Sequence, residues 1–221
     1  MNQPVVSPAV TAAINAGGIV LFEGGTDPLR AGFGAVLSEL IKAVTHSNYS
    51  HSAMLPPNSG MIFESTIKNG ISGPQENSLS STLTEYGNEG GHAWVFNFLP
   101  QFAPDWDAVA TFQQQLIALR VAGKMPYNVR RLFEDGIKRS WVADVVFLPA
   151  DGVILYLGDH SKGIVCSEDC GLSCQAGGVV TKLTAAGIPW LPNVAPPNQP
   201  IGCSPQDLAD MPMFSPPVQL L

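Results

Sequence analysis

Short apolar segments of two kinds alternate along this chain, and this alternation limits the folds open to it. Residues 18–23 (GIVLFE) form a β-branched run that ends at a Gly-Gly pair, which is typical of a strand. In residues 29–45 the apolar side chains recur three and four residues apart, which is the spacing of an amphipathic helix. We therefore expect an α+β protein, formed by residues 1–221 as a single domain.

The two patterns continue along the rest of the sequence. A Pro-Pro-Asn-Ser-Gly cluster joins two brief apolar runs and predicts an antiparallel pair of strands. These strands are expected over 50–55 and 61–65 and a further one over 92–99, with helices over 105–121, 127–138 and 166–176, the last ending at a Gly-Gly pair. The tail, about residues 189–221, is rich in proline, and we expect it to be irregular and extended over the surface.

Composition and charge exclude several classes of protein. With 45% hydrophobic and 13% charged residues, the chain is too apolar to be disordered. Its formal net charge of −7 would repel a phosphate backbone, so we expect no nucleic acid partner. The longest apolar runs are far shorter than the roughly 20 residues of a membrane-spanning helix, so we expect no integral membrane span. Because no basic residue precedes Arg30, we expect no secretory signal and a cytoplasmic location.

The four cysteines are Cys166, Cys170, Cys174 and Cys203, and the first three lie close together. Such crowding is not typical of a secreted disulfide framework, so we expect reduced thiols. On a helix the first three would share one face and could bind a metal together with Cys203 or His160. Structural zinc sites prefer a closer C-x₂-C spacing, however. We therefore expect no metal and no other cofactor, with Cys170 and Cys174 facing the core.

Cys166 stands where a strand-like run turns into a helix. The amino terminus of a helix carries positive partial charge and unpaired N–H groups, which lower the pKa of a thiol below about 8.5 and favour the thiolate. This position is typical of a nucleophile. The alternative is that Cys166 is a small buried apolar residue, as most free cysteines are.

A cysteine nucleophile needs a histidine base, and the base needs a polar group that orients it. Three of the four histidines lie in less favourable places: His46 ends a predicted helix, His92 opens a strand and His160 lies in a polar turn. His51 begins a predicted strand, and antiparallel pairing with the next strand would set Glu64 beside it. Taken singly, His51 and Glu64 could both be ordinary surface residues, and only their combination indicates a site.

Six pieces of the chain, taken in order, resemble the circularly permuted branch of the NlpC-type papain-like cysteine hydrolases, which includes the YiiX-like proteins and the lecithin retinol acyltransferases. The pieces are residues 18–22, 49–53 (YSHSA), 62–64 with 70–71, 123–127 (GKMPY), 165–168 (VCSE) and 204–208 (SPQDL). The resemblance implies a permuted papain-like core: a small antiparallel sheet packed against helices, with the nucleophile at a helix amino terminus.

Carried over position by position, the resemblance makes Cys166 the nucleophile, His51 the general base and Glu64 the group that orients the imidazole. Tyr49 and Tyr127 are expected to contact substrate in the cleft, with Tyr49 a candidate oxyanion donor. Aromatic packing is the alternative for both tyrosines.

The resemblance implies a cysteine hydrolase that cleaves an amide or ester bond through an acyl-enzyme, or else transfers the acyl group. Its expected substrates are a peptide, a peptidoglycan fragment or a lipid-like acyl compound; a cell-wall substrate would require a phage lysis system or another route of export. An apolar insertion at about 138–163 is expected to form an extra hairpin, a lid or a contact surface. The alternative function is a non-catalytic interaction protein on the same fold.

Overall fold

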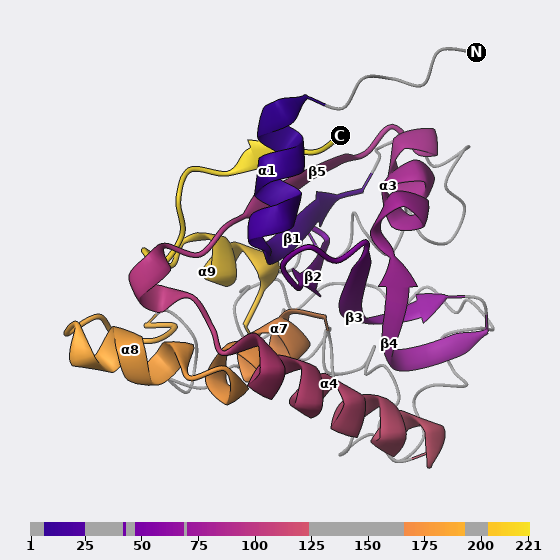
Figure 1. Cartoon of the computed structure of the whole chain (residues 1–221). Helices are drawn as coiled ribbons and strands as arrows, with labels where there is room; N and C mark the ends of the chain where they lie inside the picture. The colour runs from indigo at the N-terminus through magenta and orange to yellow at the C-terminus, as the bar shows by residue number, and fades with distance from the viewer. Residues whose placement is uncertain (1–6, 25–41, 43–46, 69, 124–165, 193–202) are drawn as a thin grey trace, which may run out of the picture.

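The structure is a computed structural model that describes residues 7–24, 42, 47–68, 70–123, 166–192 and 203–221. Over these residues it confirms an α+β fold in which helices pack against an antiparallel sheet (Figure 1). The helices predicted over 29–45 and 127–138, Tyr127 and the insertion at 138–163 lie outside the described residues.

The described strands form one six-stranded sheet in the order β4-β3-β2-β1-β5-β6. Their bounds are β1 Gly18–Glu23, β2 His51–Leu55, β3 Met61–Lys68, β4 Ile71–Ser78, β5 His92–Phe96 and β6 Val218–Gln219. Every pair of neighbours is antiparallel. The strand predictions for 18–23 and for the hairpin of β2 and β3 are therefore confirmed. β5 ends at Phe96, three residues earlier than predicted, because Pro100 starts a short 3₁₀ helix (Pro100–Phe102) and the chain turns away.

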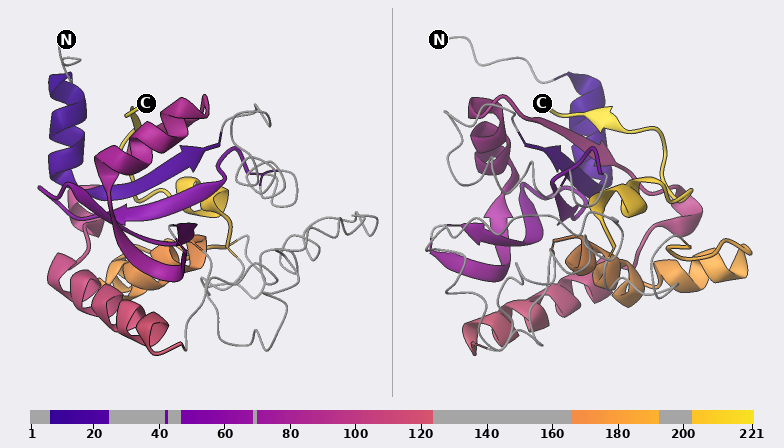
Figure 2. Two further views of the ribbon diagram at one scale, coloured as in Figure 1. Left: turned by 90° about the vertical axis from the view of Figure 1, so that its right-hand side faces the viewer. Right: turned by 180° about the vertical axis from the view of Figure 1, so that it is seen from behind.

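Helices cover both faces of the sheet (Figures 1 and 2). The larger core, which includes Ile19, Leu21 and Met54, packs against residues of α4 (Trp106–Val121), α7 (Cys166–Ala176), α8 (Val179–Ala185) and α9 (Pro205–Ala209). The opposite face carries Phe22 and Ala53 and packs against α1 (Pro8–Ala16) and α3 (Leu79–Asn88). Alternate residues of each strand therefore enter different cores.

The proline-rich tail is more regular than its composition predicts. α9 forms because Pro205 occupies the first helical position, where its missing N–H costs nothing, and Ser204 and Asp207 form a reciprocal capping box. The chain then returns to the sheet as β6, and the backbone N–H of Leu220 donates to the carbonyl of Ala93 (2.8 Å). The prediction of an irregular tail is thus wrong for these residues. Among the described helices, none is long and apolar enough to cross a membrane.

Candidate active site

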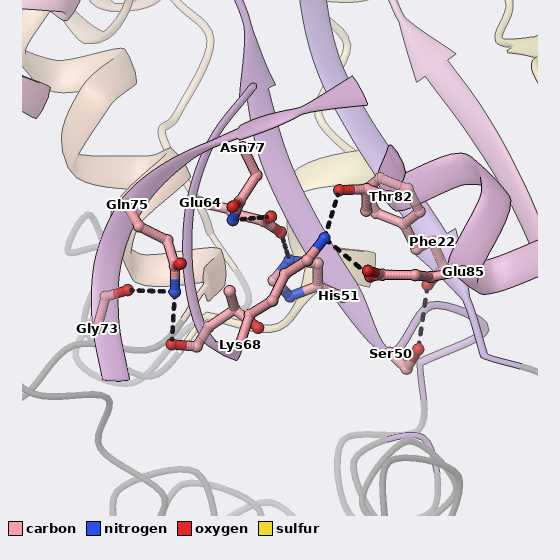
Figure 3. A network of polar contacts seen from close by, with 11 residues as sticks. Phe22, Ser50, His51, Glu64, Lys68, Gly73, Gln75, Asn77, Thr82 and Glu85 are labelled. Carbon is pink, nitrogen blue, oxygen red and sulfur yellow. Dashed lines mark hydrogen bonds and ion pairs between the residues drawn. The ribbon is translucent and has the colours of Figure 1, made fainter. Parts of the chain in front are cut away.

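The hairpin of β2 and β3 brings His51 and Glu64 together. Met54 lies opposite Phe63, and continuing this register sets Glu64 beside Ala53, on the same face of the sheet as His51. Nε2 of His51 contacts Oε2 of Glu64 directly, as Figure 3 shows. The two residues are only 7% and 2% exposed, so water screens this contact weakly.

Cys166 is the first residue of α7 and is 2% exposed. The imidazole of His51 and the backbone and side chain of Ser52 lie next to this thiol and act on its pKa. Because Nε2 of His51 is engaged by Glu64, the nitrogen that remains for the thiol is Nδ1. The structure therefore joins the three residues singled out in the sequence in one series: thiol, imidazole and carboxylate.

The electrostatics of this series favour an ion pair between Cys166 and His51. Burial opposes the thiolate, but the charge and hydrogen bond of His51, with the contacts from Ser52, hold the pKa of Cys166 below its ordinary value. Burial also opposes the imidazolium, but the thiolate of Cys166 and the carboxylate of Glu64 raise the pKa of His51 to about 10. Each partner thus favours the charged form of the other.

Glu64 stays ionised although it is buried. Burial raises its pKa, but hydrogen bonds from His51 and Asn77 and the charges of His51 and Lys68 outweigh this effect and lower the pKa. Nδ2 of Asn77 donates to Oε1 of Glu64 at 2.7 Å. The ammonium of Lys68 contacts Oε2 of Glu85 (2.8 Å) and Oγ1 of Thr82 (3.2 Å) on α3 (Figure 3). A buried anion is thus matched by donors and positive charge on its own and neighbouring strands.

The other cysteines of α7 face the core, which confirms that prediction. Cys170 and Cys174 are fully buried in the larger core. Burial raises the pKa of Cys174 to about 12 and holds that of Cys170 well above its ordinary value. The four cysteines, all of which lie among the described residues, form no disulfide. Among the described residues, no group of three or more His, Cys, Asp and Glu side chains could hold a metal ion.

Tyr49 lies two residues before His51, and its described contacts are those of a packing aromatic. Its ring meets Trp94 and Phe96 edge-on, with centroids 5.6 and 5.9 Å apart. Partial burial and the charges of Glu23 and Asp210 raise its pKa. The expected contact of Tyr49 with substrate therefore stays a prediction. The same holds for Tyr127, which lies outside the described residues, as do His46 and His160.

Three polar residues at the site were not among the sequence predictions. Asn77 lies on β4, whose sequence ISGPQENS lacks the alternation of a strand. Asp169, one turn after Cys166, is buried and accepts a hydrogen bond from Gln113 on α4 (2.6 Å). Ser52 follows His51 on β2, so strand alternation directs its side chain to the opposite face of the sheet, where α7 packs.

The arrangement has the parts that proton transfer at a thiol requires. The imidazole can accept a proton from Cys166 and return it, while Glu64 fixes the orientation of the ring. A scan against protein-family models found no match, and a search of curated proteins found no matching sequence.

Proposed function

We propose that this protein is a cysteine hydrolase that cleaves an amide or ester acyl bond through an acyl-enzyme. Cys166 is the nucleophile, His51 the general base and acid, and Glu64 the group that orients the imidazole. The observation that carries this proposal is the buried series of neighbouring groups from Cys166 through His51 to Glu64, contributed by α7, β2 and β3, in which Glu64 contacts the imidazole directly and the imidazole and thiol shift each other's pKa.

The reaction begins with the Cys166 thiolate, which attacks the carbonyl carbon and forms a C–S bond. The oxyanion that develops is stabilised by N–H groups at the start of α7, together with the positive end of that helix. His51 gives its proton to the leaving amine or alcohol as the C–N or C–O bond breaks. Water then attacks the thioester while His51 takes a proton from it, and the thiolate of Cys166 leaves.

Glu64 keeps the ring of His51 in a productive orientation. Its carboxylate is bound to Nε2, which leaves Nδ1 as the ring nitrogen available to the thiol. It also stabilises the imidazolium, because an anion in a dry environment interacts strongly with a neighbouring cation.

The proposal includes a permuted papain-like core of the NlpC type. Two features support it: the histidine precedes the cysteine along the chain, and the cysteine begins the helix that packs against the sheet. The substrates that fit this core are a peptide, a peptidoglycan fragment or a lipid-like acyl compound. All three present a carbonyl with an amine or alcohol as the leaving group, so one mechanism serves each of them.

An activated ester, p-nitrophenyl acetate, tests the proposal without knowledge of the natural substrate. We expect release of p-nitrophenol and transient acetylation of Cys166, detected by peptide mass spectrometry. His51→Ala should slow acetylation of Cys166 by roughly 10²- to 10⁴-fold, the usual contribution of a general base. Glu64→Gln should slow it less, because the amide keeps the shape of the side chain but loses its charge.

Cys174→Ala is the matched control, because it removes a thiol of the same helix that is buried away from the triad and has a raised pKa. Its acetylation rate should equal that of the wild type. A non-catalytic interaction protein would acetylate slowly at Cys166 and at the same rate in His51→Ala, and that result would end the proposal.

A further inference from the structure

Asn77 contacts the carboxylate of Glu64 from β4, whereas His51 contacts it from β2, on the other side of β3. In the pairing of β3 with β4, Glu64 lies opposite Gln75, so Asn77 is its diagonal neighbour on the same face. The amide of Asn77 donates to Oε1, and His51 contacts Oε2 (Figure 3). Each oxygen of this carboxylate therefore has a partner, and the two partners come from the strands on either side of β3.

We propose that Asn77 is a positioning residue, which holds the Glu64 carboxylate in the one rotamer that engages His51. This inference rests on the proposed function, because a positioning role requires a reaction to serve. It extends the series of three residues to a fourth that does not touch the reacting atoms.

A glutamate needs such a partner more than a shorter side chain would. Glu64 has three side-chain torsions, and a single contact to His51 leaves it free to rotate away. A buried oxygen without a partner is also costly, since the group loses its hydration and gains nothing in return. The amide of Asn77 hangs on only two torsions from a paired strand, so it fixes the carboxylate at little further cost in entropy.

The charged groups around Glu64 do not replace this contact. Lys68 lowers the pKa of Glu64 through its charge, but its ammonium is bound to Thr82 and Glu85. Burial raises the pKa of Tyr86 from α3 and of Asp169 from α7, to about 7 for Asp169, and both are close enough for the charge of Glu64 to contribute to the rise. Of these groups, only His51 and Asn77 have a hydrogen bond to the carboxylate.

Gln75 offers a matched comparison within the same strand. It carries the same amide group and lies directly opposite Glu64 in the register. Its Nε2, however, donates to the backbone carbonyls of Thr66 (3.2 Å) and Gly73 (3.4 Å). Removing this amide should affect the stability of the strand without releasing Glu64.

The test is the rate of Cys166 alkylation by iodoacetamide, followed by mass spectrometry from pH 5 to 9. At pH 6, Asn77→Ala should react roughly three- to tenfold more slowly than the wild type, which is the range for one charge-assisted hydrogen bond acting through two residues. The midpoint of the profile should move to higher pH, because a displaced Glu64 stabilises the imidazolium less. Gln75→Ala should keep the rate and midpoint of the wild type, even if it melts at a lower temperature.

Asn77→Leu is a second variant of nearly the same size. Its apolar side chain cannot donate a hydrogen bond to Glu64, so it should slow alkylation about as much as alanine does. Wild-type rates of alkylation in both Asn77 variants, or equal losses of rate in Asn77→Ala and Gln75→Ala, would overturn the positioning role. If His51→Ala is still slow in that case, the hydrolase proposal stands. Slow alkylation in the wild type, unchanged in His51→Ala, would overturn both.

Discussion

Asp169 is a carboxyl group enclosed between α7 and α4, and its burial makes stability depend on pH. The residue is 1% exposed. Its Oδ1 accepts a hydrogen bond from Gln113 at 2.6 Å, while Oδ2 has no hydrogen-bond partner among the described residues. Burial raises the pKa of Asp169 from 3.8 to about 7, against the lowering effect of the Gln113 amide. In the folded protein the side chain of Asp169 is therefore mainly protonated below a pH of about 7.

The size of the effect follows from the two pKa values. The difference between 3.8 and about 7 is about 3 pH units, and one unit corresponds to about 1.4 kcal/mol, so the full effect is about 4 kcal/mol. Its sign is fixed, since the unfolded chain ionises first. The stabilisation is fully present below pH 3.8 and is lost as the pH rises to about 7. An amide in the same place cannot ionise and avoids this loss.

We therefore expect Asp169→Asn to be more stable than the wild type at pH 8, by up to about 4 kcal/mol, and similar to it at pH 4. Urea unfolding at a series of pH values measures the difference, which cancels the titration of all other groups. Asp107→Asn, the same substitution at an exposed position of α4, should run parallel to the wild type. A wild-type and Asp169→Asn difference that does not grow between pH 4 and 8 would refute this reasoning.

Two further substitutions test the packing of the sheet and the tail. A Cβ at Gly18 would lie 2.3 Å from the carbonyl oxygen of Phe96, so Gly18→Ala should lower the melting temperature sharply. At Gly60 a Cβ meets open space, so Gly60→Ala should leave the melting temperature unchanged. Equal melting temperatures of the two variants would contradict the close approach of β1 and β5. Ser204→Ala removes the capping box of α9 and should cost about 1 kcal/mol in urea unfolding; no loss would show that the cap contributes nothing.

The sequence predicts those parts of the fold whose signals are local. The hairpin of β2 and β3 has apolar runs on both sides of a Pro-Gly turn cluster, so its strands follow from residue types alone. The end of α7 is likewise marked by Gly177 and Gly178. β4 is different, because its Gly73 and Pro74 weaken the strand signal and are tolerated only at the edge of a sheet.

The site residues that the sequence predicts are brought together by local contacts, whereas the residues that it misses reach the site through tertiary contacts. His51 and Glu64 meet through the register of a single short hairpin, and the residue pattern of that hairpin alone indicates their meeting. The contact of Asn77 depends on β4, a strand without a pattern, and the burial of Asp169 depends on α4, which lies more than forty residues before it in the chain. Contacts of this kind arise from tertiary packing and have no local periodicity that would predict them.

The location of the site follows from the alternation of residues along β2. His51 shares a face with Ala53 and lies against Phe22, in the core below α3, whereas Ser52 and Met54 point to the opposite face, where α7 packs. A thiol above the middle of the sheet would meet residues of one face alone. His51 and Ser52 both act on the pKa of Cys166 and are the first two residues of β2, so the thiol lies at the beginning of this strand. A slip of β2 by one residue would exchange these two side chains, so the register of this strand decides whether the thiol has a base beside it.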